Sequence, residues 1–163
     1  MTGKWSQTGV PHRGWCCIDI DDVGDDFHIC QMCEVQPVRY VHTMEHPDYP
    51  DTLDVGCVCA GNMEQDYHAA RTREARFKQT KKRRQRWLEQ HWRTSASGND
   101  YINTKDGFNV VIFRSRGVFW SGRIVHRPSG ERMFARHRYR TAEQAKLAAF
   151  DGMLEMKHKM NEA

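Results

Sequence analysis

Two closely spaced pairs of cysteines constrain the fold of this chain most. The first pair lies in Cys30-Gln31-Met32-Cys33, and the second, in Cys57-Val58-Cys59, follows after 23 residues. Thiolates bind zinc strongly, and two cysteines separated by two residues can turn both sulfurs onto one ion. A metal also suits a chain of 163 residues whose parts would each bury little core. The pattern predicts a structural Zn²⁺ ion, closed by four protein ligands: Cys30, Cys33, Cys57 and Cys59.

The tight spacing of the second pair leaves other ligand sets open. Only one residue separates Cys57 from Cys59, so another side chain could replace one of the four thiolates. The candidates for that position are His28, His42, Cys16 and Cys17. Buried free cysteines and an iron–sulfur cluster are further alternatives, although paired spacing suits tetrahedral zinc better.

The N-terminus and the hydropathy of the chain bear on its compartment. The first fifteen residues contain no apolar stretch of the kind found in secretory signals, so we do not expect export. No apolar run approaches the roughly 20 residues that cross a bilayer, so no membrane partner is expected. These features favour a reducing, cytoplasmic compartment in which the cysteines stay available as ligands.

Charge is distributed unevenly along the chain. Residues 1–66 contain 3 basic and 12 acidic side chains, residues 67–93 contain 10 and 2, and residues 94–163 contain 12 and 7. An acidic head followed by a basic body predicts a polyanionic partner for the body, nucleic acid first. Intramolecular neutralisation of the basic helix by the head is the alternative.

The acidic head crowds five carboxylates into residues 19–26. A calcium loop needs oxygen ligands at alternating positions and a distal Glu, but Val23 occupies a ligand position and that Glu is missing. A solvated turn is expected here, or a surface that contacts a basic protein partner.

The order of elements around the cysteines resembles a treble-clef zinc finger over residues 28–75. Residues 37–42 favour a strand, residues 53–56 favour a return strand, and a helix is expected from about Asn62 or Met63. A short strand is also expected at residues 16–20. The resemblance implies a knuckle, a hairpin, a second ligand pair and a helix in that order.

The same region carries residue types found in HNH endonucleases, which build a nuclease on a similar finger. That resemblance implies a metal-dependent nuclease with His42 as the base, helped by three further residues: His46, Asn62 and His68. The chain departs from the family because Asn62 follows the second cysteine pair.

A long basic helix is expected over residues 68–92, which contain no Pro or Gly. Its cations surround the helix, where a surface helix would continue an apolar stripe. Such a helix is either solvated or pressed against an anion such as the phosphate backbone. The candidate phosphate contacts are Arg71, Arg73, Arg76, Lys78, Lys81, Lys82, Arg83, Arg84 and Arg86.

After a linker at residues 94–107, the C-terminal part predicts three strands and one helix. The strands are expected at residues 109–116, 119–126 and 132–139, and Thr141 has the features of a helix N-cap. Arg114-x-Arg116 and Trp120-x-Gly122 resemble the ethylene-response-factor DNA-binding domain, as does Thr141-x-Glu143-x-Ala145. In that family the sheet reads the major groove. The resemblance implies contacts from Arg114, Arg116 and Trp120, and charge adds Arg123, Arg132 and Arg136.

We therefore expect an α+β fold with a zinc-stapled finger (28–66) after an acidic segment (1–27). These are followed by a basic helix (67–93), the linker (94–107) and a three-stranded sheet with one packing helix (108–163). The expected function is non-enzymatic nucleic-acid binding, with duplex DNA ahead of RNA. The HNH-type nuclease and an adaptor that binds a protein through the acidic head are the alternatives.

Overall fold

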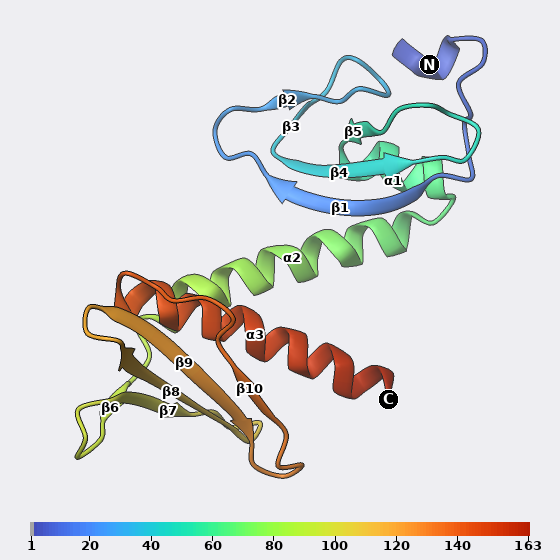
Figure 1. Ribbon diagram of the computed structural model, residues 1–163. Coiled ribbons are helices and arrows are strands. Elements are labelled where there is room, and N and C mark those ends of the chain that lie inside the picture. The colour runs from blue at the N-terminus through green and yellow to red at the C-terminus, as the bar shows by residue number, and fades with distance from the viewer. Residues whose placement is uncertain (1) are drawn as a thin grey trace. The chain divides into compact units, whose positions relative to one another are not determined.

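The computed structural model describes residues 2–163 and confirms the α+β class (Figure 1). The chain forms two compact units, of which unit 1 ends at Thr80 and unit 2 is Lys81–Ala163. The boundary falls inside helix α2 (Tyr67–Trp87), so the residues of one helix belong to both units.

Unit 1 is built on a three-stranded antiparallel sheet in the order β1-β4-β5, formed by Cys16–Asp22, Tyr40–Glu45 and Leu53–Val55. Helix α1 (Cys57–Glu64) packs against β1 and β4. Fully buried methionines, Met32, Met44 and Met63, form much of the core with Val55. Strands β1 and β5 overlap the segments expected from the sequence, residues 16–20 and 53–56, whereas β4 overlaps only the end of the strand expected at residues 37–42.

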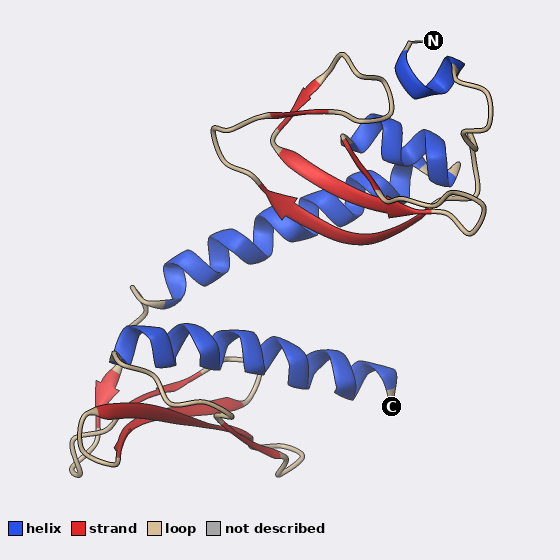
Figure 2. Ribbon diagram, turned by 45° about the horizontal axis from the view of Figure 1, so that its top comes forward, coloured by secondary structure: helices blue, strands red, loops and turns tan. Residues whose placement is uncertain are grey.

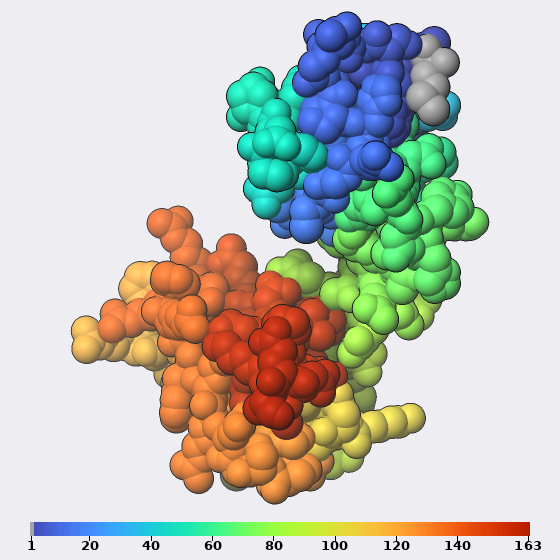
Figure 3. Space-filling view, turned by 90° about the vertical axis from the view of Figure 1, so that its right-hand side faces the viewer, coloured from blue at the N-terminus to red at the C-terminus, as the bar shows by residue number. Residues whose placement is uncertain are grey.

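A small knuckle holds the first cysteine pair. It connects the two-residue strands β2 (His28–Ile29) and β3 (Pro37–Val38), and its turn is closed by the Glu34 N–H, which donates to the Cys30 carbonyl at 2.8 Å. The short 3₁₀ helix η1 (Gly3–Ser6) lies against the knuckle, where Lys4 N–H donates to Met32 O at 2.8 Å. The dark blue N-terminal segment accordingly lies on the surface of unit 1 (Figure 3).

The helices differ from their expected bounds. Helix α1 begins at Cys57 rather than near Asn62, so both cysteines of the second pair lie within it. It ends at Gln65, whose left-handed backbone (φ 59°) separates α1 from α2. Helix α2 ends at Trp87 instead of Trp92, and the following residues form turns bonded back to Arg86 and Trp87.

The sheet of unit 2 has five strands rather than three, in the order β10-β9-β8-β7-β6. Strands β8 (Phe108–Ser115), β9 (Phe119–His126) and β10 (Arg132–Phe134) match the expectation, although β10 is shorter than predicted. The expected linker contains a hairpin of β6 (Arg93–Thr94) and β7 (Asp100–Asn103). Gly98, with φ of +80°, makes its turn possible.

Helix α3 (Ala142–Glu162) covers one face of this sheet, and no other helix or strand of unit 2 covers the opposite face (Figure 2). Its N-cap is Thr141, whose hydroxyl accepts from Gln144 N–H at 3.1 Å, as the sequence indicates. The core between helix and sheet includes Phe108, Ile112 and Phe150. Among the described residues, no helix combines the length and apolar character needed to cross a membrane.

Candidate functional site

Three of the four predicted zinc ligands converge in unit 1. The sulfurs of Cys30, Cys33 and Cys59 all lie within 4.8 Å of one another, contributed by the knuckle and by helix α1. Cys30 is buried, and the other two are partly exposed. Three convergent thiolates form a donor set that could hold a metal ion, with at least one coordination position left for a further ligand.

The surroundings of Cys30 favour the thiolate over the thiol, as the direction of its pKa shift indicates. The Cys59 side chain and the backbone groups of Cys33 and Gly56 hydrogen bond to the Cys30 sulfur and lower the pKa of Cys30 to about 5. The same hydrogen bond, together with burial, raises the pKa of Cys59. The Trp5 side chain also hydrogen bonds to the Cys59 sulfur. Fixed donors directed at sulfur are the surroundings expected of metal-binding thiolates.

Cys57 does not join the other three cysteines. It belongs to a second group with His42 and Glu74, whose donor atoms also lie within 4.8 Å of one another. The reason is helical geometry, since two residues two positions apart on an α-helix point about 200° apart around its axis. The predicted set of four thiolates on one ion is therefore not assembled in this arrangement.

The second group forms a buried hydrogen-bond network. His42, on β4, is completely buried, and its Nε2–H donates to Glu74 Oε2 at 3.1 Å. Lys78 Nζ donates to the other Glu74 oxygen at 2.5 Å, and Arg73 Nε approaches His42 Nδ1 at 3.4 Å. Arg73 also forms a bidentate ion pair with Glu64, at 3.0 and 2.9 Å.

Burial is the main influence on the protonation of this network. It lowers the pKa of His42 and raises the pKa of Cys57. Burial also acts to raise the pKa of Glu74, but hydrogen bonds from Lys78 and His42 outweigh it and lower that pKa overall. The network therefore contains a neutral imidazole, a thiol and an ionised carboxylate.

The other candidate zinc ligands lie outside both groups. His28 and Cys16 are exposed, and the Cys17 thiol donates to the Asp19 carbonyl at 3.2 Å. His42 was predicted as a replacement ligand, and it lies in the second group rather than with Cys30.

The residues suggested by the HNH resemblance are not brought together as one group. His46 packs on Trp15 and bonds to the Arg13 carbonyl at 3.1 Å. Neither His46 nor His68 joins the group that contains His42. His68 and Asn62 are exposed on α2 and α1, whereas His42 is completely buried.

Many of the predicted phosphate contacts on α2 have internal partners. Besides Arg73 and Lys78, Arg84 forms a bidentate ion pair with Asp151 on α3. Arg71 lies over the Tyr67 ring and Arg83 over the Phe150 ring. Lys81 also has an interaction. The exposed cations of α2 that have no side-chain partner among residues 2–163 are Arg76, Lys82 and Arg86.

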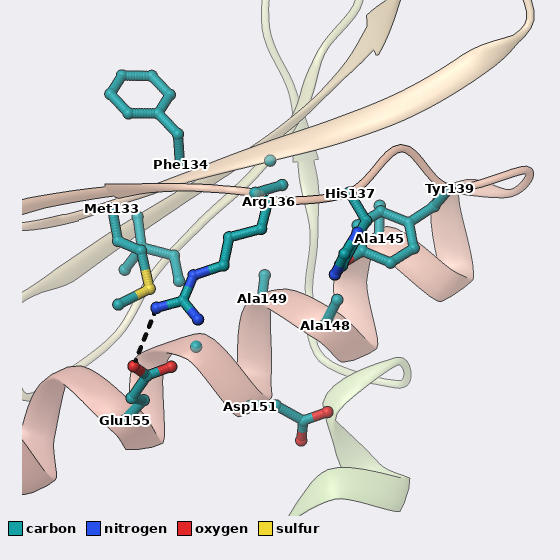
Figure 4. A pocket seen from close by; sticks show the side chains of 14 residues that line it. Met133, Phe134, Arg136, His137, Tyr139, Ala145, Ala148, Ala149, Asp151 and Glu155 are labelled. Atoms are coloured by element: carbon teal, nitrogen blue, oxygen red, sulfur yellow. Dashed lines mark hydrogen bonds and ion pairs between the residues drawn. The ribbon is translucent and has the colours of Figure 1, made fainter.

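The predicted sheet contacts divide between the two faces of the unit 2 sheet. Trp120 packs against the core on the α3 side, and Arg114 lies over its ring at 4.7 Å. Arg116 occupies the tight turn after β8, with φ of 46°. Arg136 points toward α3 and pairs with Glu155 at 3.3 Å, while Phe134 points the other way (Figure 4). Both Arg136 and Glu155 line a cavity of about 330 Å³ between α3 and the residues after β10.

The face of the sheet opposite α3, which we term the open face, carries a continuous row of side chains across all five strands. Strand register aligns one residue from each strand, and alternation places each of them on the side away from the buried core positions. The row consists of Arg93, Tyr101, Val111, Arg123 and Phe134. Arg132 lies beside it, directly opposite Val125.

Of this row, the sequence pointed to Arg123 and missed the remaining members. Tyr101 lies in a segment that was expected to be a linker, and Arg93 was expected at the end of the basic helix. Phe134 is an exposed aromatic residue whose face depends on register. Arg123 Nε is buried and has no hydrogen-bond partner among the described residues. A buried donor without a partner is unusual in proteins.

We compared the chain with known protein families, curated proteins and solved structures. No protein-family model, curated protein or solved structure matches this chain. The arrangement of its own side chains therefore carries what can be inferred about its function.

Proposed function

We propose that this chain binds nucleic acid through the open face of unit 2, while Zn²⁺ on Cys30, Cys33 and Cys59 stabilises unit 1. The observation that carries the first part is the row from Arg93 to Phe134. It combines two arginines and two aromatic rings on a sheet face that no helix of unit 2 covers. Proteins that bind single strands use aromatic rings for base stacking and arginines for phosphates or base edges.

The charge on the two sides of the sheet supports this proposal. Acidic residues near the sheet face α3, where Asp100 pairs with Lys146 at 2.8 Å and Asp106 pairs with Lys157. The strand positions that alternate onto the open face include Arg93, Arg123 and Arg132 and no carboxylate. A surface cleared of carboxylates is suited to a polyanion.

Unpaired bases fit this face better than the duplex DNA expected from the sequence. Phe134 is 60% exposed and Phe119, near the other end of β9, is 37% exposed. An exposed ring gains from stacking on a base, which an intact duplex does not offer. Arg123 lies in the same row, and the terminal N–H groups of an arginine can donate to a base edge or a phosphate oxygen. Lys82 and Arg86, four residues apart on α2, could add general phosphate attraction.

The zinc proposal rests on the donor set and on the order of elements. Knuckle, β4–β5 hairpin and helix follow one another in the order of a treble-clef finger, and Cys59 enters the cluster from the helix. Three thiolates favour zinc over magnesium or calcium, which prefer oxygen ligands. The HNH-type nuclease is not favoured, because its proposed base, His42, is completely buried and hydrogen bonded.

A binding assay on matched arginine variants tests the nucleic-acid proposal. Fluorescence anisotropy would measure affinity for labelled single-stranded DNA, RNA and duplex DNA at two salt concentrations. We expect Arg123→Ala to weaken single-strand binding about 10- to 150-fold, the equivalent of roughly 1.5–3 kcal/mol for a hydrogen bond that involves a charged group. Arg136→Ala removes the same charge from the α3 side and should have a much smaller effect. Equal losses in the two variants would contradict binding at the open face.

A further inference from the structure

We infer that His42, Cys57 and Glu74 form a second metal-binding site for a borderline divalent ion such as Zn²⁺, separate from the three-cysteine cluster. The residues come from three elements: the middle of β4, the first turn of α1 and α2. Imidazole nitrogen, thiolate sulfur and carboxylate oxygen are the three donor types that proteins use for zinc. The inference does not depend on the proposed binding of nucleic acid.

The distances between donors are close to those a metal would require. Ligand atoms around a tetrahedral zinc ion lie about 3.3–3.8 Å apart, given bond lengths of about 2.0–2.3 Å. All three donor atoms already lie within 4.8 Å of one another, and His42 Nε2 and Glu74 Oε2 are 3.1 Å apart. An ion could therefore bind with side-chain adjustments and without movement of β4 or the helices.

Binding would release the proton of the Cys57 thiol to solvent and break three contacts of the existing network, of which the first is the hydrogen bond from His42 Nε2–H to Glu74. The ion would replace Lys78 as the partner of Glu74, and the Lys78 side chain, 41% exposed, can return its ammonium group to water. Coordination through His42 Nε2 moves the imidazole proton to Nδ1, so the 3.4 Å approach of Arg73 Nε would be lost. Arg73 would keep its bidentate ion pair with Glu64.

The site has access to solvent on one side. Cys57 and Glu74 line a cavity of about 630 Å³, and the three cysteines of the first cluster line the same cavity. His42 lies behind them, completely buried. Three protein ligands with a remaining position that faces a cavity are typical of a zinc ion that binds water or another small ligand.

Two arrangements of Cys57 can be separated by counting ions. If Cys57 completes a four-thiolate site, the chain holds one ion, and His42 and Glu74 have no effect on it. If Cys57 belongs with His42 and Glu74, the chain holds two ions, and each group loses its own ion independently. The geometry points to the second arrangement, because the Cys57 sulfur lies with His42 and Glu74, whereas the Cys59 sulfur lies with those of Cys30 and Cys33.

The experiment measures zinc per chain in the full-length protein, reconstituted under reducing conditions, by elemental analysis. We expect two ions in the natural sequence, and one ion in both Glu74→Gln and Cys57→Ser. Glu64→Gln is the matched control, since it changes a neighbouring carboxylate that lies in neither group, and it should retain two ions. Circular dichroism would establish that each variant is folded.

Cobalt spectra provide a second readout that does not depend on a variant's stability. Titration of the natural sequence with Co²⁺ should fill two spectroscopically different sites. One should have strong sulfur-to-cobalt charge transfer from three thiolates, and the other a weaker band from one thiolate. A single ion that is lost in Cys57→Ser but kept in Glu74→Gln would overturn the inference in favour of four thiolates. A single ion kept in both variants would overturn it in favour of a hydrogen-bond network only.

Discussion

At the scale of single residues, Cys59 links helix α1 to the knuckle that holds Cys30 and Cys33. Its sulfur lies with those of Cys30 and Cys33 and accepts a hydrogen bond from the Trp5 side chain. Trp5 in turn belongs to η1, whose backbone bonds to the knuckle at Met32. One sulfur therefore links the N-terminal segment, the knuckle and the helix, and a metal ion there would contribute directly to folding.

Substitution of Cys59 should separate metal-dependent from metal-independent stability. We expect Cys59→Ser to lower the thermal midpoint of unit 1 clearly and to reduce its sensitivity to a chelator, because ion binding is part of the folding free energy. Cys16→Ser is the control, since Cys16 is exposed and lies in neither donor group. Thermal unfolding with and without EDTA measures both effects. A chelator response as large in Cys59→Ser as in the natural sequence would contradict this role.

Part of the site follows from sequence spacing and part does not. The spacing of Cys30 and Cys33 predicts their convergence, because a short knuckle turns both sulfurs to one side. Whether the Cys57 sulfur joins the cluster depends on where α1 begins. Because the helix begins at Cys57, both Cys57 and Cys59 are helical, and helix geometry separates their two sulfurs. Glu74 could not be associated with His42, because only the packing of α2 brings it there.

At the scale of elements, the last turn of α2 is anchored in unit 2 by Trp87. Its ring is 5% exposed, packs at 5.6 Å from Phe150 and at 5.3 Å from Trp92, and its indole N–H donates to the Lys146 carbonyl at 2.7 Å. The end of a helix that the sequence describes as basic is therefore held by an aromatic core residue.

Removal of this anchor should destabilise unit 2. We expect Trp87→Ala to lower the free energy of unfolding of unit 2 by about 3–5 kcal/mol, the usual range for a buried aromatic residue replaced by alanine. Phe134→Ala is the control, because its ring is exposed on the open face and its loss should change stability by less than about 0.5 kcal/mol. Urea unfolding followed by tryptophan fluorescence for Phe134→Ala, and by circular dichroism for both variants, measures the difference. Similar losses in the two variants would contradict the assignment of Trp87 to the core.

Elements with strong local patterns were predictable, and short elements were not. Strands β8 and β9 have alternating apolar residues, and α3 begins at a capping threonine. Strand β6 contains two residues and exists only because it pairs with β7, so its sequence carries no signal of its own. Turn residues 95–99 therefore resembled a linker, although they close a hairpin.

At the scale of the whole molecule, the uneven charge along the sequence is partly neutralised within each unit. In unit 1, Asp22 of the acidic head pairs with Arg39, and Glu64 and Glu74 pair with cations of α2. In unit 2, Asp100 and Asp106 pair with lysines of α3, and Glu155 of α3 pairs with Arg136. The basic surplus that remains includes the arginines of the open face, where we propose that nucleic acid binds.

Photo-crosslinking would locate bound nucleic acid on the protein surface. Ultraviolet irradiation of the protein bound to a single-stranded oligonucleotide, followed by mass spectrometry of the digested complex, identifies the residues in contact with bases. If nucleic acid binds at the open face, we expect crosslinks at Tyr101 and Phe134, which share a row with Arg123. Crosslinks confined to Trp120, on the α3 side, or to residues of unit 1 would contradict binding at the open face.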